Sequence, residues 1–139
     1  MPTIAVNDIE ICYESFGDAD APPLLLVMGL GAQMTLWSPG FVSELLERGF
    51  RVIRFDNRDI GLSTKLDWMQ VPDTTAIAAA LQRGEVPAVP YTLEDMAADT
   101  AELLTALGYD KAHIVGESMG GMIGQIMAIN LPERLLSLT

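Results

Sequence analysis

One short stretch constrains the fold of this chain more than any other: a serine flanked by glycines, where an apolar run meets an apolar helical stretch. Residues 116–120 have the sequence Gly-Glu-Ser-Met-Gly. The preceding residues 111–115 favour a buried strand, and residues 119–130 favour a helix. A strand that turns directly into a helix brings the two backbones too close for a Cβ, which accounts for the glycines. The pattern predicts a sharp turn that holds the Ser118 hydroxyl clear of the backbone.

The rest of the chain alternates strand and helix patterns after an initial hairpin. Apolar residues alternate on both sides of Asn7-Asp8, which is typical of a two-residue β-hairpin turn. Residues 24–28 form a continuous apolar run, as expected for a strand buried on both faces. Further strands are predicted over 50–56 and 135–139, and helices from Ser38-Pro39 to Gly49, over 76–82, and from a capping box at Thr92 to Gly108. This order predicts an α/β fold within one domain, residues 1–139, with a mostly parallel sheet, helices on both faces and an N-terminal antiparallel hairpin.

The composition and charge argue against several classes of binding partner. The chain has 139 residues, of which 50% are hydrophobic, and a formal net charge of −11. That charge argues against nucleic acid or an anionic membrane as a partner, because both need a basic face. The longest apolar stretch, residues 24–32, is too short to span a bilayer. The first residues lack the basic start and apolar core of a signal peptide, and Cys12 has no partner for a disulfide, so a cytoplasmic protein is predicted.

Ser118 would need help to act as a nucleophile. A serine hydroxyl is weakly nucleophilic by itself and requires a base and donors for the developing negative charge. In such a turn, the backbone N–H of the next residue, Met119, points at that charge, and the helix N-terminus adds a favourable dipole. A second N–H is expected from the glycine-rich loop over residues 28–31, and we assign it to Leu30. The predicted catalytic set is therefore Ser118, Met119 and Leu30.

The sequence does not match the residue spacing of nucleotide-, phosphate- or metal-binding motifs. Residues 29–31 lack the third glycine of a dinucleotide fingerprint, and residues 116–120 lack the Lys-Ser/Thr of a phosphate-binding loop. No His, Cys and Asp residues have the spacing of metal ligands. The sequence therefore predicts neither a cofactor nor a metal.

The other polar residues are expected to be structural. His113 is the only histidine, and it lies inside the strand before the turn, where a packing role is expected. One group of acids is expected on a solvated helix face: Glu94, Asp95, Asp99 and Glu102. A second group is expected to position a loop through mutual hydrogen bonds: Asp56, Arg58 and Asp59.

Three motifs resemble the α/β-hydrolase superfamily, and its esterase- and lipase-like members in particular, along essentially the whole chain. Residues 25–29 (Leu-Leu-Val-Met-Gly) correspond to the oxyanion strand and loop, with Met-Gly in place of the usual His-Gly. Residues 56–63 resemble the Asp-x-Arg-x-x-Gly-x-Ser segment, and residues 116–121 match the nucleophile elbow. The Met-Gly variant, together with Arg-Asp in the middle motif, is similar to aclacinomycin methylesterase-like bacterial hydrolases.

This resemblance implies a serine hydrolase that acts on small-molecule carboxylic esters. Ser118 would be the nucleophile, and the amides of Leu30 and Met119 would form the oxyanion hole. The acid and the histidine of the family follow later strands, beyond a cap region, and the chain contains neither. We therefore expect an N-terminal portion of the hydrolase domain, ending after about the sixth strand and inactive alone. The missing groups would come from the remaining C-terminal part, as a second or cleaved chain.

Two alternatives stay open at this point. The chain could be a non-catalytic binding or scaffold form, or an inactive fragment, of the same fold. Within the enzymes, the same scaffold also supports perhydrolases and hydrolases of carbon–carbon bonds, because a fold does not determine a reaction.

Overall fold

The computed structural model describes all 139 residues, and a six-stranded sheet lies at its centre. Strands β1 (Thr3–Val6) and β2 (Ile9–Phe16) form an antiparallel hairpin, and β2 pairs antiparallel with β4 (Arg51–Phe55). The remaining strands, β3 (Pro23–Val27), β5 (Ala112–Gly116) and β6 (Leu135–Leu138), continue the sheet in parallel, in the order β1-β2-β4-β3-β5-β6. The predicted α/β fold with an antiparallel N-terminal hairpin and a mostly parallel sheet is confirmed.

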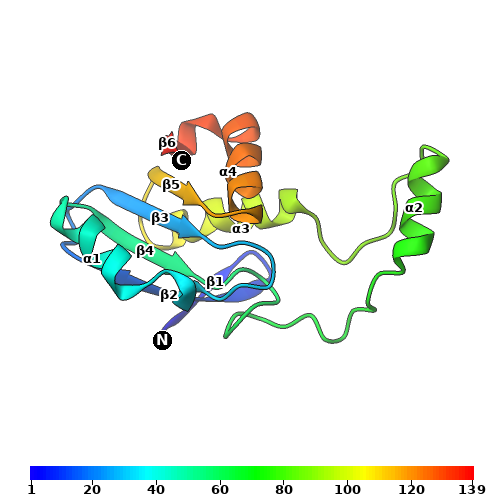
Figure 1. The fold of residues 1–139 in the computed structure, drawn as a ribbon, viewed down its shortest axis with the longest axis horizontal. Coiled ribbons are helices and arrows are strands. Elements are labelled where there is room, and N and C mark those ends of the chain that lie inside the picture. The colour runs from blue at the N-terminus through cyan, green and yellow to red at the C-terminus, as the bar shows by residue number, and fades with distance from the viewer.

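Helices cover both faces of this sheet (Figure 1). Helix α1 (Pro39–Glu47) packs on one face through Val42, against Leu24 and Leu26 of β3. Helices α3 (Leu93–Ala106) and α4 (Met119–Asn130) pack on the other face, where they meet the two alternate residues of β3, Leu25 and Val27. Because successive side chains of a strand point to opposite faces, the apolar run of β3 contributes to both layers.

Local capping residues set where the helices begin. The Ser38 hydroxyl accepts the N–H of Phe41 at 3.2 Å, and Pro39 occupies the first helical position of α1. Thr92 and Asp95 form a reciprocal capping box: the Thr92 N–H donates to Asp95 Oδ2 at 2.7 Å, and the Asp95 N–H donates to Thr92 Oγ1 at 3.3 Å. Both predicted helix starts are confirmed.

Residues 67–91 form an arm that extends away from the sheet and carries α2 (Thr74–Gln82) (Figure 1). Ala80 is the only buried residue of α2, and the arm exposes several large apolar side chains: Trp68, Val71, Leu81 and Val86. The helix begins two residues earlier than predicted because Asp73 caps it, accepting the N–H groups of Thr75 and Ala76. Two short 3₁₀ turns, Met34–Leu36 and Pro132–Arg134, complete the structure. None of the helices combines the length and the apolar character needed to cross a lipid bilayer.

Because β3 packs against helices on both faces of the sheet, we predict how a substitution in this strand changes stability. Leu25 is fully buried in the larger core cluster. We expect Leu25→Ala to lower the free energy of unfolding by about 2–5 kcal/mol, because it removes apolar burial and leaves a cavity. Urea or thermal unfolding measures the change. Leu81→Ala, on the exposed arm, is the matched control and should cost less than about 0.5 kcal/mol; equal losses in the two variants would contradict the two-layer packing.

Candidate active site

Ser118 occupies the turn between β5 and α4 in a strained backbone conformation. Its φ is 53° and its ψ is −119°, in a region that residues with a Cβ rarely adopt. The side chain is exposed and does not cap the helix that begins at the next residue. The chain thus turns sharply from strand to helix at Ser118, as the flanking glycines predict.

Two of the glycines are required by close backbone contacts. A Cβ on Gly116 would overlap the backbone of Gly120, and a Cβ on Gly120 would overlap the carbonyl oxygen of Val27 at the end of β3. A Cβ on Gly121 would instead make an ordinary contact, 3.4 Å from the Gly116 carbonyl oxygen. The turn is therefore packed directly against the neighbouring strand, with no room for side chains between them.

The loop after β3 lies against this turn. The Glu117 N–H donates to the Val27 carbonyl at 3.0 Å, and a Cβ placed on Gly29 would lie 3.1 Å from the Cβ of Ser118. The backbone N–H groups of Leu30 and Met119 donate to no acceptor within the chain. The structure thus brings the three predicted site residues to one place and leaves two amide donors unpaired there.

Leu30 and Met119 also border one small hollow, with a volume of about 160 Å³. Most of its lining is apolar. The lining comes from the loop after β3, the loop after β4, the start of α3 with the two residues before it, and the first residue of α4: Leu30, Gly31, Arg58, Ile60, Tyr91, Thr92, Leu93, Met96 and Met119. Four other hollows are larger, from about 270 to about 510 Å³; the two largest lie along the arm, and none of the four contains a predicted site residue. Size alone therefore does not identify the site, and we base the assignment on the strained serine and the unpaired amides.

Asp56, at the end of β4, connects the two loops that border the hollow. Its Oδ1 accepts the Met34 N–H at 2.8 Å, and its Oδ2 accepts the Leu62 N–H at 2.9 Å. Its main-chain oxygen accepts the Ser63 hydroxyl at 2.6 Å. Gly61 has a φ of 53° and touches the carboxylate so closely that a Cβ there would overlap it. The buried carboxylate therefore organises the turn over residues 57–66.

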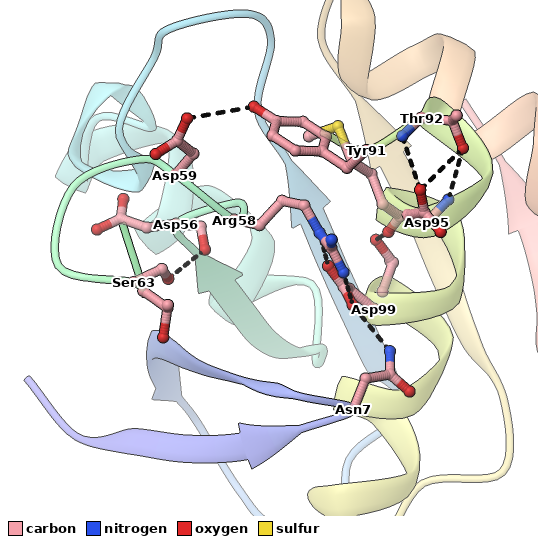
Figure 2. A network of polar contacts seen from close by, with 12 residues as sticks. Asn7, Asp56, Arg58, Asp59, Ser63, Tyr91, Thr92, Asp95 and Asp99 are labelled. Atoms are coloured by element: carbon pink, nitrogen blue, oxygen red, sulfur yellow. Dashed lines mark hydrogen bonds and ion pairs between the residues drawn. The ribbon is translucent and has the colours of Figure 1, made fainter. Parts of the chain in front are cut away.

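Arg58 forms a buried ion pair with Asp99 of α3 (Figure 2). Its Nε and Nη2 donate to the two carboxylate oxygens at 2.6 and 2.8 Å, and Asn7 of the hairpin turn donates to the same carboxylate at 2.8 Å. The guanidinium carbon also lies 5.5 Å from the centre of the Tyr91 ring. The hydrogen bonds to Asp99 raise the pKa of Arg58 above its ordinary value, so the guanidinium stays charged despite its burial.

Two sequence predictions about these charges are wrong. Asp99 is only 2% exposed instead of solvated. The sequence did indicate that Asp99 is buried, because Asp99 follows Met96 by three residues and therefore lies on the same, buried face of α3. No hydrogen bond joins Asp56, Arg58 and Asp59 to one another, because each side chain binds a different segment. The expected exposure of Glu94, Asp95 and Glu102 is confirmed.

His113 contacts residues away from the turn. Its Nδ1 lies 2.8 Å from the Ser137 hydroxyl of β6, and its ring packs edge-on against Phe50 with centroids 5.4 Å apart. The three residue steps from His113 to Gly116 span roughly 10 Å of strand, which separates the imidazole from the turn at Ser118. The contacts of His113 are therefore those of a packing residue. No group of three or more His, Cys, Asp and Glu side chains comes together as a set of metal ligands.

Comparison with known proteins gives the family. The sequence profile of the α/β-hydrolase fold matches residues 22–139, and the chain belongs to this family. It is 36% identical to rhodomycin D methylesterase DnrP from Streptomyces peucetius, over 100% of this chain and 41% of that protein. It is 30% identical to 3-oxoadipate enol-lactonase 2 from Acinetobacter baylyi, over 95% of this chain and 41% of that protein.

Solved structures agree with this assignment. The enol-lactonase from Burkholderia xenovorans LB400 superposes with a TM-score of 0.75 and 29% identity, over 99% of this chain and 45% of that one. A hydrolase from Pseudomonas aeruginosa PA01 gives a TM-score of 0.75 with 32% identity, over 99% and 43%. The chain thus spans about two-fifths of the length of the relatives it matches. The resemblance stated from the three motifs is confirmed.

The close contact at Gly120 yields a prediction with a matched control. Gly120→Ala should lower the free energy of unfolding by about 1–3 kcal/mol, because the added methyl overlaps a main-chain oxygen that cannot move aside easily. Gly121→Ala, at the next position, should keep or slightly raise the free energy of unfolding, because the added methyl has room and alanine favours a helix over glycine. Thermal unfolding of the two variants distinguishes them, and a stable Gly120→Ala protein would contradict the contact with Val27.

The Arg58–Asp99 pair yields a second prediction. Asp99→Ala should cost about 3–5 kcal/mol of unfolding free energy, because it leaves a buried guanidinium without its partner. Glu102→Ala, on the exposed face of the same helix, is the control and should change stability by less than about 0.5 kcal/mol. Denaturant titration measures both, and similar losses would contradict the burial of the pair.

Proposed function

We propose that this chain carries the nucleophile and the oxyanion-binding amides of a serine hydrolase that cleaves carboxylic esters. One observation carries the proposal: a strained, exposed Ser118 lies against the Gly29 loop, with unpaired amides at Leu30 and Met119 beside it. The similarity to a methylesterase and to an enol-lactonase supports a carbonyl substrate of this class.

The proposed reaction follows from these groups. The base takes the proton of the Ser118 hydroxyl as the hydroxyl oxygen adds to the ester carbonyl, and the resulting oxyanion accepts hydrogen bonds from the N–H groups of Met119 and Leu30. Each such donor contributes about 3–4 kcal/mol of transition-state stabilisation. The alcohol leaves with a proton from the base, and water then hydrolyses the acyl-enzyme. The apolar lining of the hollow suits an acyl or alkyl group of the ester.

The general base belongs, in this proposal, to a part of the protein outside these 139 residues. His113 is the only histidine, and its imidazole binds Ser137. The matched relatives are more than twice as long as the chain, which leaves room for a histidine and an acid in a C-terminal part or a second chain. We expect the assembled hydrolase to act in the cytoplasm on small-molecule esters.

The contact of His113 with Ser137 also favours a second candidate function, because it leaves this chain without a free histidine to act as the base. In this second candidate, the chain binds a ligand in the hollow but does not convert it. The two candidates differ in one property, the reactivity of Ser118. A serine activated by a base and facing an oxyanion hole reacts with electrophilic phosphonates, whereas an unassisted serine does not.

Fluorophosphonate labelling of the assembled hydrolase, which is this chain together with the part that supplies the base, therefore tests the proposed function. We expect a phosphonyl adduct at Ser118, located by mass spectrometry, together with esterase turnover. Ser118→Ala should abolish both, by a factor of at least about 10³ in turnover, while the circular dichroism spectrum stays unchanged. A Ser137→Ala variant, which alters the His113 contact, should still be labelled. A folded wild-type protein that is not labelled would favour the binding form, and turnover by Ser118→Ala would refute the assignment of the nucleophile.

A further inference from the structure

The loop that carries the Leu30 amide is held at both ends by residues that follow β4. At its start, the side-chain amide of Asn57 donates from Nδ2 to the Met28 carbonyl at 3.0 Å. At its end, Asp56 accepts the Met34 N–H at 2.8 Å. Asn57 is 2% exposed and Met28 is 5% exposed, whereas Leu30 between the two anchors is 81% exposed. The loop is thus anchored at its ends and open at its centre.

The residue between the first anchor and Leu30 is a glycine. The Met28 carbonyl and the Gly29 N–H belong to one planar peptide, so a hydrogen bond to that carbonyl determines the orientation of the whole peptide plane. Only the two backbone dihedrals of Gly29 then separate this plane from the Leu30 N–H. Glycine is the most permissive residue in these dihedrals. A Cβ at this position would crowd the turn, because it would lie 3.1 Å from the Ser118 Cβ and 3.2 Å from the Glu117 carbonyl oxygen.

We propose that Asn57 is a positioning residue that holds the Leu30 amide in line with Ser118, through its hydrogen bond to the Met28 carbonyl. This inference rests on the proposed function, because it concerns the same site. The close approach of loop and turn requires a flexible residue at position 29, and the Asn57 anchor compensates for that flexibility. Asn57 does not line the hollow, so its effect passes through the loop alone.

An uncharged donor suits this position. The Met28 carbonyl oxygen is buried beside the first turn of α4, where it would lie 3.0 Å from a Cβ on Gly120. A neutral amide satisfies this buried acceptor without placing an additional charge beside the developing oxyanion. Asp56 makes the second anchor, but its carboxylate also binds Leu62, so its removal would disturb more than the loop. Asn57 is therefore the residue whose substitution isolates the anchor.

The test compares Asn57→Asp with Ser63→Ala, each made in the assembled hydrolase. The first variant keeps the shape of the side chain but replaces its N–H donor with an acceptor that repels the Met28 carbonyl. The second removes buried hydrogen bonds to the Asp56 main-chain carbonyl and from the Cys12 N–H, and it leaves in place the Asp56 carboxylate that accepts the Met34 N–H. We expect Asn57→Asp to lower kcat and the rate of fluorophosphonate labelling about 10- to 100-fold with KM nearly unchanged, because the misplaced donor acts mainly in the transition state. Ser63→Ala should retain the wild-type rates.

A pH profile separates positioning from simple destabilisation. When protonated, the introduced carboxyl can again donate to the Met28 carbonyl, so the ratio of Asn57→Asp to wild-type labelling rates should rise as the pH falls. Asn57→Ala lacks any donor, and its ratio should stay constant; it also serves if Asn57→Asp does not fold. Hydrogen exchange of peptides that cover residues 28–34 provides a readout without catalysis, and it should be faster in Asn57→Ala than in Ser63→Ala.

The outcomes distinguish the two proposals. If the wild type is labelled at Ser118 and Asn57→Ala is labelled equally fast, the positioning role is refuted and the proposed function stands. Unchanged exchange of the 28–34 peptides in Asn57→Ala also refutes it. If the folded wild type is not labelled, the proposed function fails. The positioning role then fails too, because Ser118 is not reactive and the Leu30 amide has no oxyanion to bind.

Discussion

The site depends on one close backbone contact, between the carboxyl end of β3 and the first turn of α4. The Val27 carbonyl oxygen accepts the Glu117 N–H at 3.0 Å and lies against Gly120, where any Cβ would overlap it. This contact exists because β3 and β5 are parallel neighbours, with Val27 opposite Gly116, so both strands end at the same edge of the sheet. The loop after β3 and the turn after β5 must therefore meet, and the glycines at 29, 116 and 120 let their backbones approach.

Polar residues then attach this edge to the rest of the molecule. The segment after β4 binds the loop after β3 through Asp56 and Asn57, and it binds α3 through the Arg58–Asp99 pair. Figure 2 shows how Asn7 of the hairpin turn reaches the same carboxylate. Burying such a pair has a large desolvation cost, so its net contribution to stability is small compared with the cost of breaking it. The pair and its Asn7 contact join three segments that are distant in sequence: the hairpin turn, the loop after β4 and α3.

Much of the fold could be predicted because its signals are local. The Asn7-Asp8 turn, the Ser38 cap and the Thr92–Asp95 capping box each depend on residues within four positions of one another, and all three are confirmed. The prediction for Asp99 is wrong because its charge favours a solvated position, whereas its helical spacing from Met96 places it on the buried face. Asn57 had no signal at all, since its partner is a main-chain oxygen 29 residues away. The catalytic roles of Ser118, Met119 and Leu30 stay predictions that labelling tests, although the structure brings these residues together.

The sequence by itself determined the class of fold and the place of the turn at Ser118, because hydrophobic periodicity, capping residues and glycine spacing act over a few residues. It also determined the family, through motifs at residues 25–29, 56–63 and 116–121. Only the tertiary structure decided which loops meet: that the Leu30 amide lies beside the turn, that Asn57 anchors the Met28 carbonyl, and that Asp99 is paired instead of solvated. These contacts follow from the strand order of the sheet, which a pattern of local preferences does not contain, because pairing between distant strands is selected by the packing of the whole core.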